Sequence, residues 1–277
     1  MYRSHGKKKK FSFKEKLLLL FFFIIFAASV TWLIVYRVNA AENEAQMAAL
    51  RASALSSSQV PSSSTPLPSS QVKSAAASSA SSAVSSAVRA FPQLQAKNSD
   101  IKAWIQIEGT AVNYPVMQTP KEPEYYLHRN LAKQAESRGL PFLDVKSDLK
   151  KSKNYLVYGH NMRDGTAFAG LLGYLDKSFC KKHPIIHFDT QNGTGDYQVI
   201  AEFRSKIYRT DSKAFKYYQY ADIETKNHFD TYIKNVKKRA DYDTGLTASY
   251  GEQLLTLSTC YQFVKNGRLV IVAKKVK

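Results

Sequence analysis

The longest uncharged apolar stretch of the chain, residues 17–36, limits the possible architectures more than any other feature. It reads LLLLFFFIIFAASVTWLIVY, and its 20 residues match the roughly 20 that a helix needs to cross the hydrocarbon core of a bilayer. The sequence therefore predicts a transmembrane helix over 17–36. Any globular domain must fold from the residues that follow it.

The charges that flank this stretch predict its orientation. Lysine and arginine dominate residues 1–16, where Glu15 is the only acid, and positively charged flanking segments stay on the cytoplasmic side. We therefore expect a cytoplasmic tail and a single-pass protein of the cell membrane, with the residues after the helix outside the cell. A cleaved signal peptide is the alternative, because the small residues at 38–40 (VNA) suit a cleavage site. The apolar regions of signal peptides are usually shorter, however, at roughly 7–15 residues.

Serine, alanine and proline dominate residues 52–88. This composition offers too little bulky apolar surface to offset the entropy that folding costs. We therefore expect residues 37–88 to form a disordered, extended tether between the membrane and a folded domain. The remaining residues, 89–277, have the size of one domain.

The formal net charge of +18 raises the question of a nucleic-acid partner. Part of this charge lies in the tail, and the rest is scattered over short lysine-rich segments such as 146–153 and 234–239. No DNA-binding or RNA-binding motif accompanies these lysines, so we interpret them as a solvated basic surface and expect no nucleic-acid partner. Outside the cell, the expected acidic neighbours are wall polymers and anionic lipids.

Segments rich in β-branched and aromatic residues alternate with turn residues in the folded domain. They predict strands from about residue 101 and over 111–117, 154–160, 184–190, 197–208, 253–260 and 268–274. A short helix is expected before residue 101, and helical segments are expected at 166–180 and 221–240. Because strands dominate, the sequence predicts a mostly-β fold, a barrel with peripheral helices.

The chain has only two cysteines, too few for a disulfide framework, so each must be explained by burial or by reactivity. Cys260 ends the apolar segment LLTLSTC, where a side chain reaches the rim of a sheet, and Arg268 begins the next strand. Strands joined by a short loop pair antiparallel, which would bring Arg268 alongside Cys260. The guanidinium charge would favour a thiolate and stabilise an oxyanion. Cys180, in a lysine-rich helix end, is interpreted as a partly buried thiol without a disulfide.

A cysteine nucleophile needs a proton-transfer partner, usually histidine. Of the six histidines, His160 is the strongest candidate, because it ends the strand segment NYLVYGH and precedes a polar loop. Asp164 in that loop either tunes the imidazole or is simply solvated. His183 and His187 have an i,i+4 spacing, but the segment HPIIH favours a strand, in which such residues lie far apart. No metal site is therefore expected.

Three separated elements together resemble the sortases, membrane-anchored cysteine transpeptidases of Gram-positive bacteria, and within them class B. They are YGHNMRDGTAF (158–168), TLSTC (256–260) and Arg268. The resemblance implies a catalytic domain over 89–277, built as a closed eight-stranded β-barrel with N-terminal helices, and no cofactor. It also implies a helix between the sixth and seventh strands, for which residues 221–240 are suited. Class C enzymes usually carry a C-terminal membrane segment and a lid, and the sequence suggests neither.

The resemblance also implies roles for individual residues. Cys260 would attack a C-terminal sorting signal to form a thioacyl enzyme, His160 would transfer protons, and Arg268 would hold the oxyanion. The expected partners are surface proteins with an LPXTG-like or NPQTN-like signal and an amine of peptidoglycan or its precursor. The residues implied to bind substrate are Leu127, Tyr208, Ser258 and Thr259.

Two positions depart from the class B pattern. Pro123 lies near the place where members often carry asparagine, and Tyr261 follows the cysteine where some carry an acid, which argues against a Cys–His–Asp triad. Two alternatives remain open: a pilin-polymerising or housekeeping-type sortase, and a non-catalytic wall-binding module on a tether. The second would explain the anchor and the basic surface. It would not explain why His160, Cys260 and Arg268 occur together.

Overall fold

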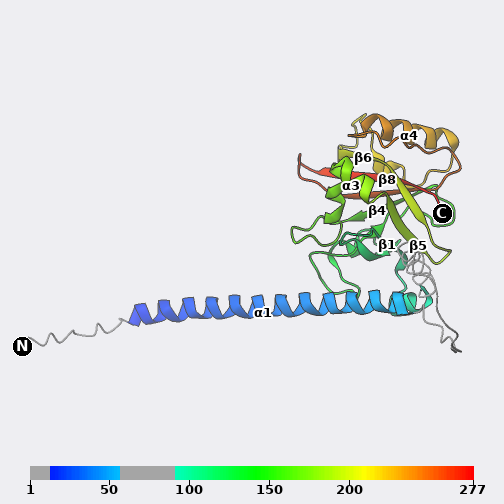
Figure 1. Ribbon diagram of the computed structural model, residues 1–277. Helices are drawn as coiled ribbons and strands as arrows, with labels where there is room; N and C mark the ends of the chain where they lie inside the picture. Colours follow the sequence, from blue (N-terminus) through cyan, green and yellow to red (C-terminus); the bar gives the residue numbers. More distant parts are fainter. Residues whose placement is uncertain (1–12, 57–90) are drawn as a thin grey trace, which may run out of the picture. The chain divides into compact units, whose positions relative to one another are not determined.

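The computed structural model describes residues 13–56 and 91–277 (Figure 1). By its contacts the chain divides into two units, Met1–Ala49 and Leu50–Lys277. All described residues of the first unit belong to the helix α1 (Phe13–Ser56), which contains the predicted apolar run. This helix is long and apolar enough to cross a membrane, and a helix of this kind serves either as an anchor or as a signal sequence.

The helix α1 continues to Ser56, which corrects the predicted start of the tether at residue 37. The segment 40–51 (AAENEAQMAALR) consists mainly of alanine, glutamate, glutamine, methionine and leucine, which are strong helix formers. Serine and proline become frequent only after residue 52, and these residues disfavour a helix interior. The predictions for residues 1–12 of the tail, for 57–88 of the tether and for 89–90 lie outside the described residues.

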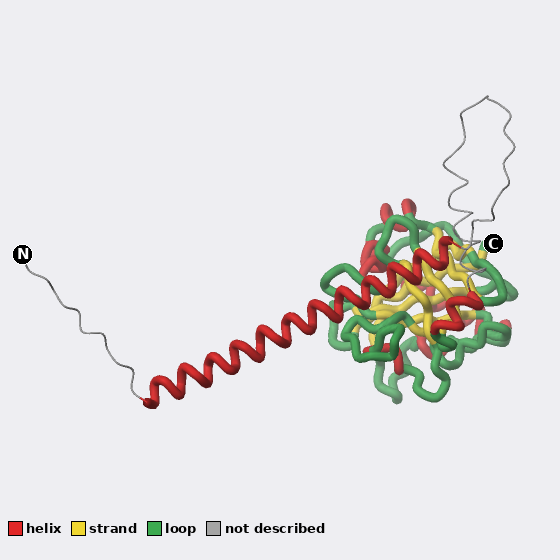
Figure 2. The backbone as a smooth tube through the Cα atoms, turned by 90° about the horizontal axis from the view of Figure 1, so that it is seen from below, coloured by secondary structure: helices red, strands yellow, loops and turns green. Residues whose placement is uncertain are grey.

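The second unit contains a closed barrel of eight strands, in the order β1-β2-β3-β4-β7-β8-β6-β5. Figure 2 shows these strands at the centre of the domain, surrounded by loops and short helices. The barrel confirms the predicted fold class. Its strands are β1 (Ile101–Gln106), β2 (Asn113–Met117), β3 (Phe142–Leu143), β4 (Asn154–Gly159), β5 (Ile185–Thr190), β6 (Asp196–Lys206), β7 (Leu254–Cys260) and β8 (Gly267–Lys275).

Every strand predicted from the sequence is present, and β3 is the strand that the sequence pattern missed. It has two residues, too few to show the alternation of apolar and polar positions that marks a strand. Its place is set by its neighbours, because Phe142 pairs with Met117 of β2 on one side and with Tyr158 of β4 on the other.

The predicted helices are present with narrower bounds. Residues 91–97 are helical ahead of β1. Region 166–180 contains the 3-10 helix η2 (Ala169–Leu175) and the start of α3 (Lys177–Lys182), and region 221–240 contains α4 (Lys226–Arg239). The helix α4 lies between β6 and β7 in the chain, as the resemblance to class B implied. Two further 3-10 helices are η1 (Tyr125–His128) and η3 (Tyr217–Gln219).

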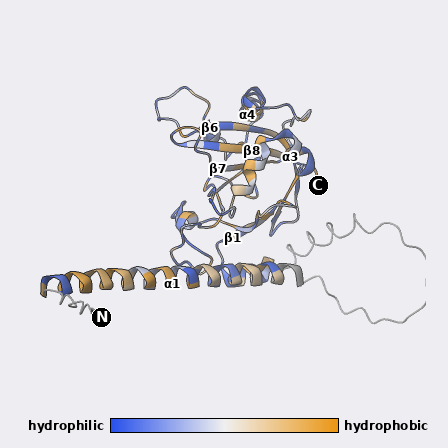
Figure 3. Ribbon diagram, turned by 60° about the vertical axis from the view of Figure 1, so that its left-hand side comes forward, coloured by the Kyte–Doolittle hydropathy of each residue, from blue (hydrophilic) through white to orange (hydrophobic). Residues whose placement is uncertain are grey.

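The helix α4 covers the barrel with an apolar face. The Thr225 side chain caps its first turn by accepting a hydrogen bond from the His228 amide, which satisfies a donor that has no partner within the helix. The side chains of Phe229, Tyr232, Ile233 and Val236 are buried, in a core shared with residues of β6, β7 and β8. Figure 3 shows the rest of α4 as largely hydrophilic, in contrast with the apolar first part of α1.

Candidate active site

The strands β4 and β7 run parallel and end at the same edge of the barrel. Gly159 is paired with Thr259 at the end of this ladder, and the Thr259 hydroxyl donates a hydrogen bond of 2.8 Å to the Gly159 carbonyl. The next residue on each strand is a predicted catalytic residue, His160 or Cys260. Both are partly exposed, so the topology brings the thiol and the imidazole to one accessible rim.

Arg268 reaches the same rim from the other side of β7. The predicted antiparallel pairing of β7 with β8 is confirmed, and its last pair is Cys260 with Arg268. The connecting loop is tight because Gly267 lacks a side chain: a Cβ there would lie 2.1 Å from the Tyr261 carbonyl oxygen. One guanidinium nitrogen of Arg268, Nη1, donates to the Gly267 carbonyl at 2.9 Å.

The loop that follows β4 is closed on itself, which fixes the backbone of His160. The Phe168 amide donates to the His160 carbonyl at 2.8 Å. The Phe168 ring also covers Gly159, where a Cβ would lie 2.6 Å from the ring, so this position before the histidine requires glycine. The Asn161 side-chain amide donates to the Cys260 carbonyl at 3.0 Å and ties this loop to the end of β7. Sequence reasoning missed Asn161, although it follows His160 directly.

The imidazole of His160 makes one hydrogen bond in the described part of the chain, between Nε2 and the Leu127 carbonyl oxygen at 2.9 Å. Its ring also lies 5.2 Å from the ring of His128. Burial and the nearby charges of His128 and Arg268 lower the pKa of His160, while the Leu127 carbonyl acts in the opposite direction. The imidazole is therefore neutral at neutral pH and available as a base.

Asp164 takes part in its own loop. Its Oδ1 accepts hydrogen bonds from the Thr166 hydroxyl at 2.6 Å and from the Thr166 amide at 3.1 Å. These hydrogen bonds hold the pKa of Asp164 below its usual value. The carboxylate therefore stabilises the turn that follows His160, and the tuning role considered for it has no hydrogen bond to support it within residues 91–277.

The structure places the four residues implied to bind substrate in different environments. Ser258 and Thr259 are each 1% exposed, and the Ser258 hydroxyl lies 2.7 Å from the hydroxyl of buried Tyr217. Both side chains are therefore buried just before Cys260 in β7, and substrate binding by these two residues stays a prediction. Leu127 presents its main-chain carbonyl to His160, and Tyr208 is half-buried beyond the end of β6.

Two pockets flank this rim. The first, of about 610 Å³, is lined by Cys260 together with Asn161, Arg163, Tyr261 and Phe263 from the loops after β4 and β7. The second, of about 520 Å³, contains Tyr208 among residues after β6 and before β8. The Cys260 thiol therefore borders the first of these pockets.

The other candidate ligands and thiols lie apart from this rim. Cys180 is buried in α3 and is a free thiol, as predicted, and burial raises its pKa. Nδ1 of His183 lies 2.7 Å from the Glu108 carbonyl oxygen, and Nδ1 of His187 lies 2.7 Å from Asp196 Oδ1. Within residues 13–56 and 91–277, no three His, Cys, Asp or Glu side chains gather as metal ligands would.

A thiol, a neutral imidazole and a guanidinium at one rim are the groups that acyl transfer through a thioester needs. The thiol supplies the nucleophile, the imidazole exchanges protons, and the guanidinium offers fixed N–H donors to an oxyanion. No bound metal is required for these steps.

Comparisons with known proteins agree with this chemistry. A family model described as a sortase domain matches residues 105–276. The chain is 34% identical to sortase B of Listeria monocytogenes over 186 residues, which cover 66% of this chain and 72% of that protein. The similar solved structures include a Staphylococcus aureus sortase B–substrate complex (TM-score 0.59, 30% identity, covering 68% of this chain and 84% of that one). They also include a sortase B complexed with triglycine (TM-score 0.60, 30% identity, covering 68% of this chain and 85% of that one).

Proposed function

The chain belongs to the sortase family of cysteine transpeptidases and is similar to its class B members, and on this premise we propose that it transfers surface proteins onto an amine of the peptidoglycan. Cys260 is the proposed nucleophile, His160 the proton-transfer residue and Arg268 the oxyanion donor. One observation carries this assignment: the three residues occupy the adjoining ends of three neighbouring strands, β4, β7 and β8.

The first half-reaction cleaves the sorting signal. The Cys260 thiol gives its proton to the neutral His160 imidazole, and the resulting thiolate attacks the carbonyl carbon of the scissile peptide bond. The carbonyl oxygen becomes an oxyanion that Arg268 stabilises. When this intermediate collapses, the C–N bond breaks and the leaving amine takes a proton from the His160 imidazolium. The products are a thioester between Cys260 Sγ and the surface protein, and a released C-terminal peptide.

The second half-reaction joins the surface protein to its acceptor. The acceptor amine attacks the thioester carbonyl while neutral His160 takes a proton from the amine nitrogen. Arg268 stabilises the second oxyanion, the C–S bond breaks, and the released thiolate takes the proton back from the His160 imidazolium. An amide bond replaces the thioester, so the enzyme ends in the state in which it began.

Similar proteins support the two substrate classes. A sortase B was solved in complex with its substrate, and a sortase B was also solved in complex with triglycine, a peptide that carries a free amine. For this chain we propose a C-terminal signal of the LPXTG-like or NPQTN-like type as the donor, and an amine of a peptidoglycan precursor or cross-bridge as the acceptor. Leu127 and Tyr208 are the proposed neighbours of the bound signal.

The apolar helix supports a membrane location. We assign residues 17–36 as a single-pass anchor, residues 1–16 as a cytoplasmic tail, and the domain from residue 89 as extracellular, with the residues between them as a linker. Protease added to intact cells should then remove the domain and leave a short N-terminal fragment in the membrane. Full protection of the domain would contradict this orientation.

The experiment that tests the proposed activity uses the full-length chain in detergent micelles with quenched peptides that carry either type of signal. Wild type and Cys180→Ala, the matched control, should cleave one peptide, whereas Cys260→Ala should not. Intact-mass spectrometry should find a thioacyl adduct on Cys260, and added triglycine should give a ligated product.

Two outcomes would overturn the proposal. Cleavage by Cys260→Ala at the wild-type rate would show that Cys260 is not the nucleophile. If no peptide were cleaved and iodoacetamide modified Cys260 no faster than a free thiol, the wall-binding module would become the better interpretation.

A further inference from the structure

We infer that Tyr126 and Gly139 are positioning residues, which fix the main-chain carbonyl of Leu127 so that it holds the His160 imidazole in one orientation and one tautomer. The inference rests on the proposed function, because it assumes that His160 is the proton-transfer residue. It assigns a role to a main-chain group and to two residues that touch neither the thiol nor the guanidinium.

The contact between His160 and Leu127 determines which ring nitrogen exchanges protons. A carbonyl oxygen only accepts hydrogen bonds, so the ring nitrogen 2.9 Å away, Nε2, must carry a hydrogen. In the neutral ring the lone pair then lies on Nδ1, which is free to take a proton and return it. In many histidine bases a carboxylate orients the ring. Within residues 91–277 no carboxylate bonds to His160, and the Leu127 carbonyl takes that place.

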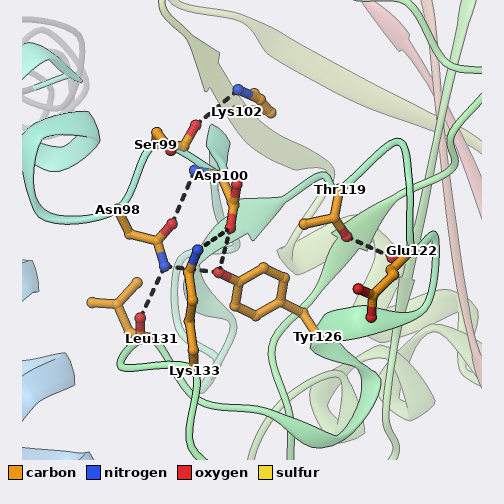
Figure 4. A network of polar contacts seen from close by, with 9 residues as sticks. All are labelled: Asn98, Ser99, Asp100, Lys102, Thr119, Glu122, Tyr126, Leu131 and Lys133. Carbon is orange, nitrogen blue, oxygen red and sulfur yellow. Dashed lines mark hydrogen bonds and ion pairs between the residues drawn. The ribbon is translucent and has the colours of Figure 1, made fainter.

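A polar network around the buried Tyr126 side chain holds η1, the short helix that carries Leu127 (Figure 4). Tyr126 in this helix has no exposed surface. Its hydroxyl donates to Asp100 Oδ2 at 2.8 Å and accepts from Asn98 Nδ2 at 2.8 Å. Lys133 Nζ lies 3.0 Å from the same Asp100 oxygen, and Asn98 Nδ2 also donates to the Leu131 carbonyl. The hydroxyl of Tyr126 thus ties η1 to the segment before β1.

The hydrogen bonds of the network require an ionised Asp100 and a protonated Tyr126 hydroxyl, and the pKa shifts of both groups favour these states. Burial acts to raise the pKa of Asp100, but the hydrogen bonds from Lys133 and Tyr126 outweigh it and hold that pKa below its usual value. Burial also raises the pKa of Tyr126, so its hydroxyl keeps the proton that it donates. A phenylalanine at position 126 would remove a donor to Asp100 and an acceptor of the buried Asn98 amide, which favours movement of η1.

Gly139 constrains the same carbonyl from a second segment of the chain. Its φ is +57°, and a Cβ there would lie 2.2 Å from the Leu127 carbonyl oxygen and 2.5 Å from that of Tyr126. The next residue, Leu140, donates its amide to the Tyr126 carbonyl at 2.9 Å. Any side chain at position 139 must therefore displace the carbonyl that His160 uses.

The groups around His160 predict what happens when this carbonyl moves. The His128 ring lies 5.2 Å from the His160 ring, Arg268 carries a positive charge nearby, and Cys260 ends the neighbouring strand. Burial lowers the pKa of His160, and so do the interactions with His128 and Arg268, whereas the Leu127 hydrogen bond raises it. Loss of that hydrogen bond should lower the pKa further and leave the tautomer unspecified. A purely structural defect would change neither property of the folded protein.

The test is nuclear magnetic resonance of the full-length chain with ¹⁵N-labelled histidine, in detergent micelles, across the pH range in which histidine titrates. Tyr126→Phe and Gly139→Ala are compared with wild type, and His160→Gln identifies the resonances. Tyr155→Phe is the matched control for the first variant, because it removes a buried hydroxyl that donates to the Leu149 carbonyl at 2.8 Å. Gly245→Ala is the control for the second, since its φ is +76° and nothing lies within 4 Å of its Cβ position.

In wild type the ring should carry its neutral-state proton on Nε2. In both variants we expect mixed tautomers, a lower pKa for His160, and a fall in kcat of about tenfold or more with little change in KM. The acid limb of the pH–rate profile should move to lower pH. Both controls should keep the wild-type tautomer, pKa and kcat.

A wild-type ring protonated on Nδ1 would overturn the inference, and so would folded variants whose His160 titrates as in wild type. If Gly139→Ala does not fold, Tyr126→Phe decides alone. The resonance measurement needs no substrate, so it separates this inference from the proposed function. Altered tautomers in an enzyme that cleaves no peptide would support the positioning and contradict the activity.

Discussion

Polar side chains on the parallel strands β4 and β7 are buried and hydrogen-bonded in the first half of the strands and partly exposed at the far end. In their first half, Asn154 of β4 and Thr256 of β7 have no exposed surface, and they form a hydrogen-bonded chain with the equally buried Tyr232 of α4. Thr256 Oγ1 donates to Asn154 Oδ1 at 2.9 Å, and the Tyr232 hydroxyl lies 2.6 Å from Thr256 Oγ1. At the far end, His160 and Cys260 are partly exposed, and no hydrogen bond joins their side chains in the part of the chain that the structure describes.

This difference follows from what burial costs. A buried polar group without a partner loses the free energy of its hydration, so the buried half must satisfy each donor and acceptor internally. At the rim, water or substrate can take the free positions, and a reacting thiol or imidazole needs them free. The buried half therefore contributes stability, and the rim contributes chemistry. Substitutions should separate the two effects.

The largest expected effect is on catalysis and comes from the rim. Arg268→Gln keeps hydrogen-bond donors but removes the charge, so we expect kcat/KM to fall by about 10²–10³-fold. The free energy of unfolding should change by no more than about 0.5 kcal/mol, because the group is partly solvated. Peptide cleavage and urea unfolding measure the two quantities.

Arg204→Gln is the matched control for that variant. Arg204 lies on β6, and its Nε pairs with Asp241 at 2.8 Å on the surface, so its loss should leave catalysis unchanged. Equal losses of activity in both variants would mean that net charge, not the position of Arg268, controls the rate.

The next effect is on stability and comes from the buried half. Asn154→Ala removes the acceptor of Thr256 and the donor to the Tyr220 carbonyl at 2.8 Å. We expect the free energy of unfolding to fall by about 3 kcal/mol, with an unchanged kcat for the folded fraction. Exposed Asn192→Ala should cost less than about 0.5 kcal/mol. A large fall in kcat with intact stability would contradict the division between the two halves.

Glu202 on β6 provides a third environment, a buried carboxyl with no hydrogen-bond donor among the described residues. Burial and the neighbouring Asp241 carboxylate raise the pKa of Glu202 to about 8. Between the ordinary pKa of a glutamate and pH 8, the folded protein therefore holds a proton on Glu202 that the unfolded chain has lost. Stability should therefore fall by about 1.4 kcal/mol per pH unit as pH rises towards 8. Glu202→Gln should remove this slope between pH values of about 6 and 7.

Glu252→Gln is the control for that pH dependence. Burial acts to raise the pKa of Glu252, but hydrogen bonds from Ser249 and Lys274 outweigh it, so that pKa is lowered. Its contribution is complete above its unfolded pKa and is lost only at acidic pH, so the slope near neutrality should not change. A slope that persists in Glu202→Gln would assign the proton uptake to another group.

Much of the rim could be predicted from the sequence because it depends on local patterns and strand pairing. The alternating and apolar segments predicted seven strands, and the short loop before Arg268 predicted its pairing with Cys260, which the register confirms. The fold class was also correct. Its closure depends on β3, whose two residues carry no pattern.

The support around the rim could not be predicted because it depends on contacts between distant segments. The carbonyl of Leu127 reaches His160 across 33 positions, and a main-chain group leaves no signature in residue type. The resemblance implied a substrate contact for Ser258, but no sequence pattern predicted that its hydroxyl lies 2.7 Å from the hydroxyl of Tyr217, 41 positions away. The helix beyond residue 37 was not predicted because the serine-rich composition that begins near residue 52 favours an extended tether.

The smallest expected effects compare two buried tyrosines that bond to hydroxyls two residues apart on β7. Tyr232 bonds to Thr256 at 2.6 Å and Tyr217 bonds to Ser258 at 2.7 Å. Each change to phenylalanine should lower the free energy of unfolding by about 1 kcal/mol. Tyr217→Phe should also lower kcat a few-fold, because Ser258 lies two residues before Cys260, whereas Tyr232→Phe should not. Equal kcat values for the two variants would mean that Ser258 contributes only to stability and that the residues important for catalysis on β7 begin at Cys260.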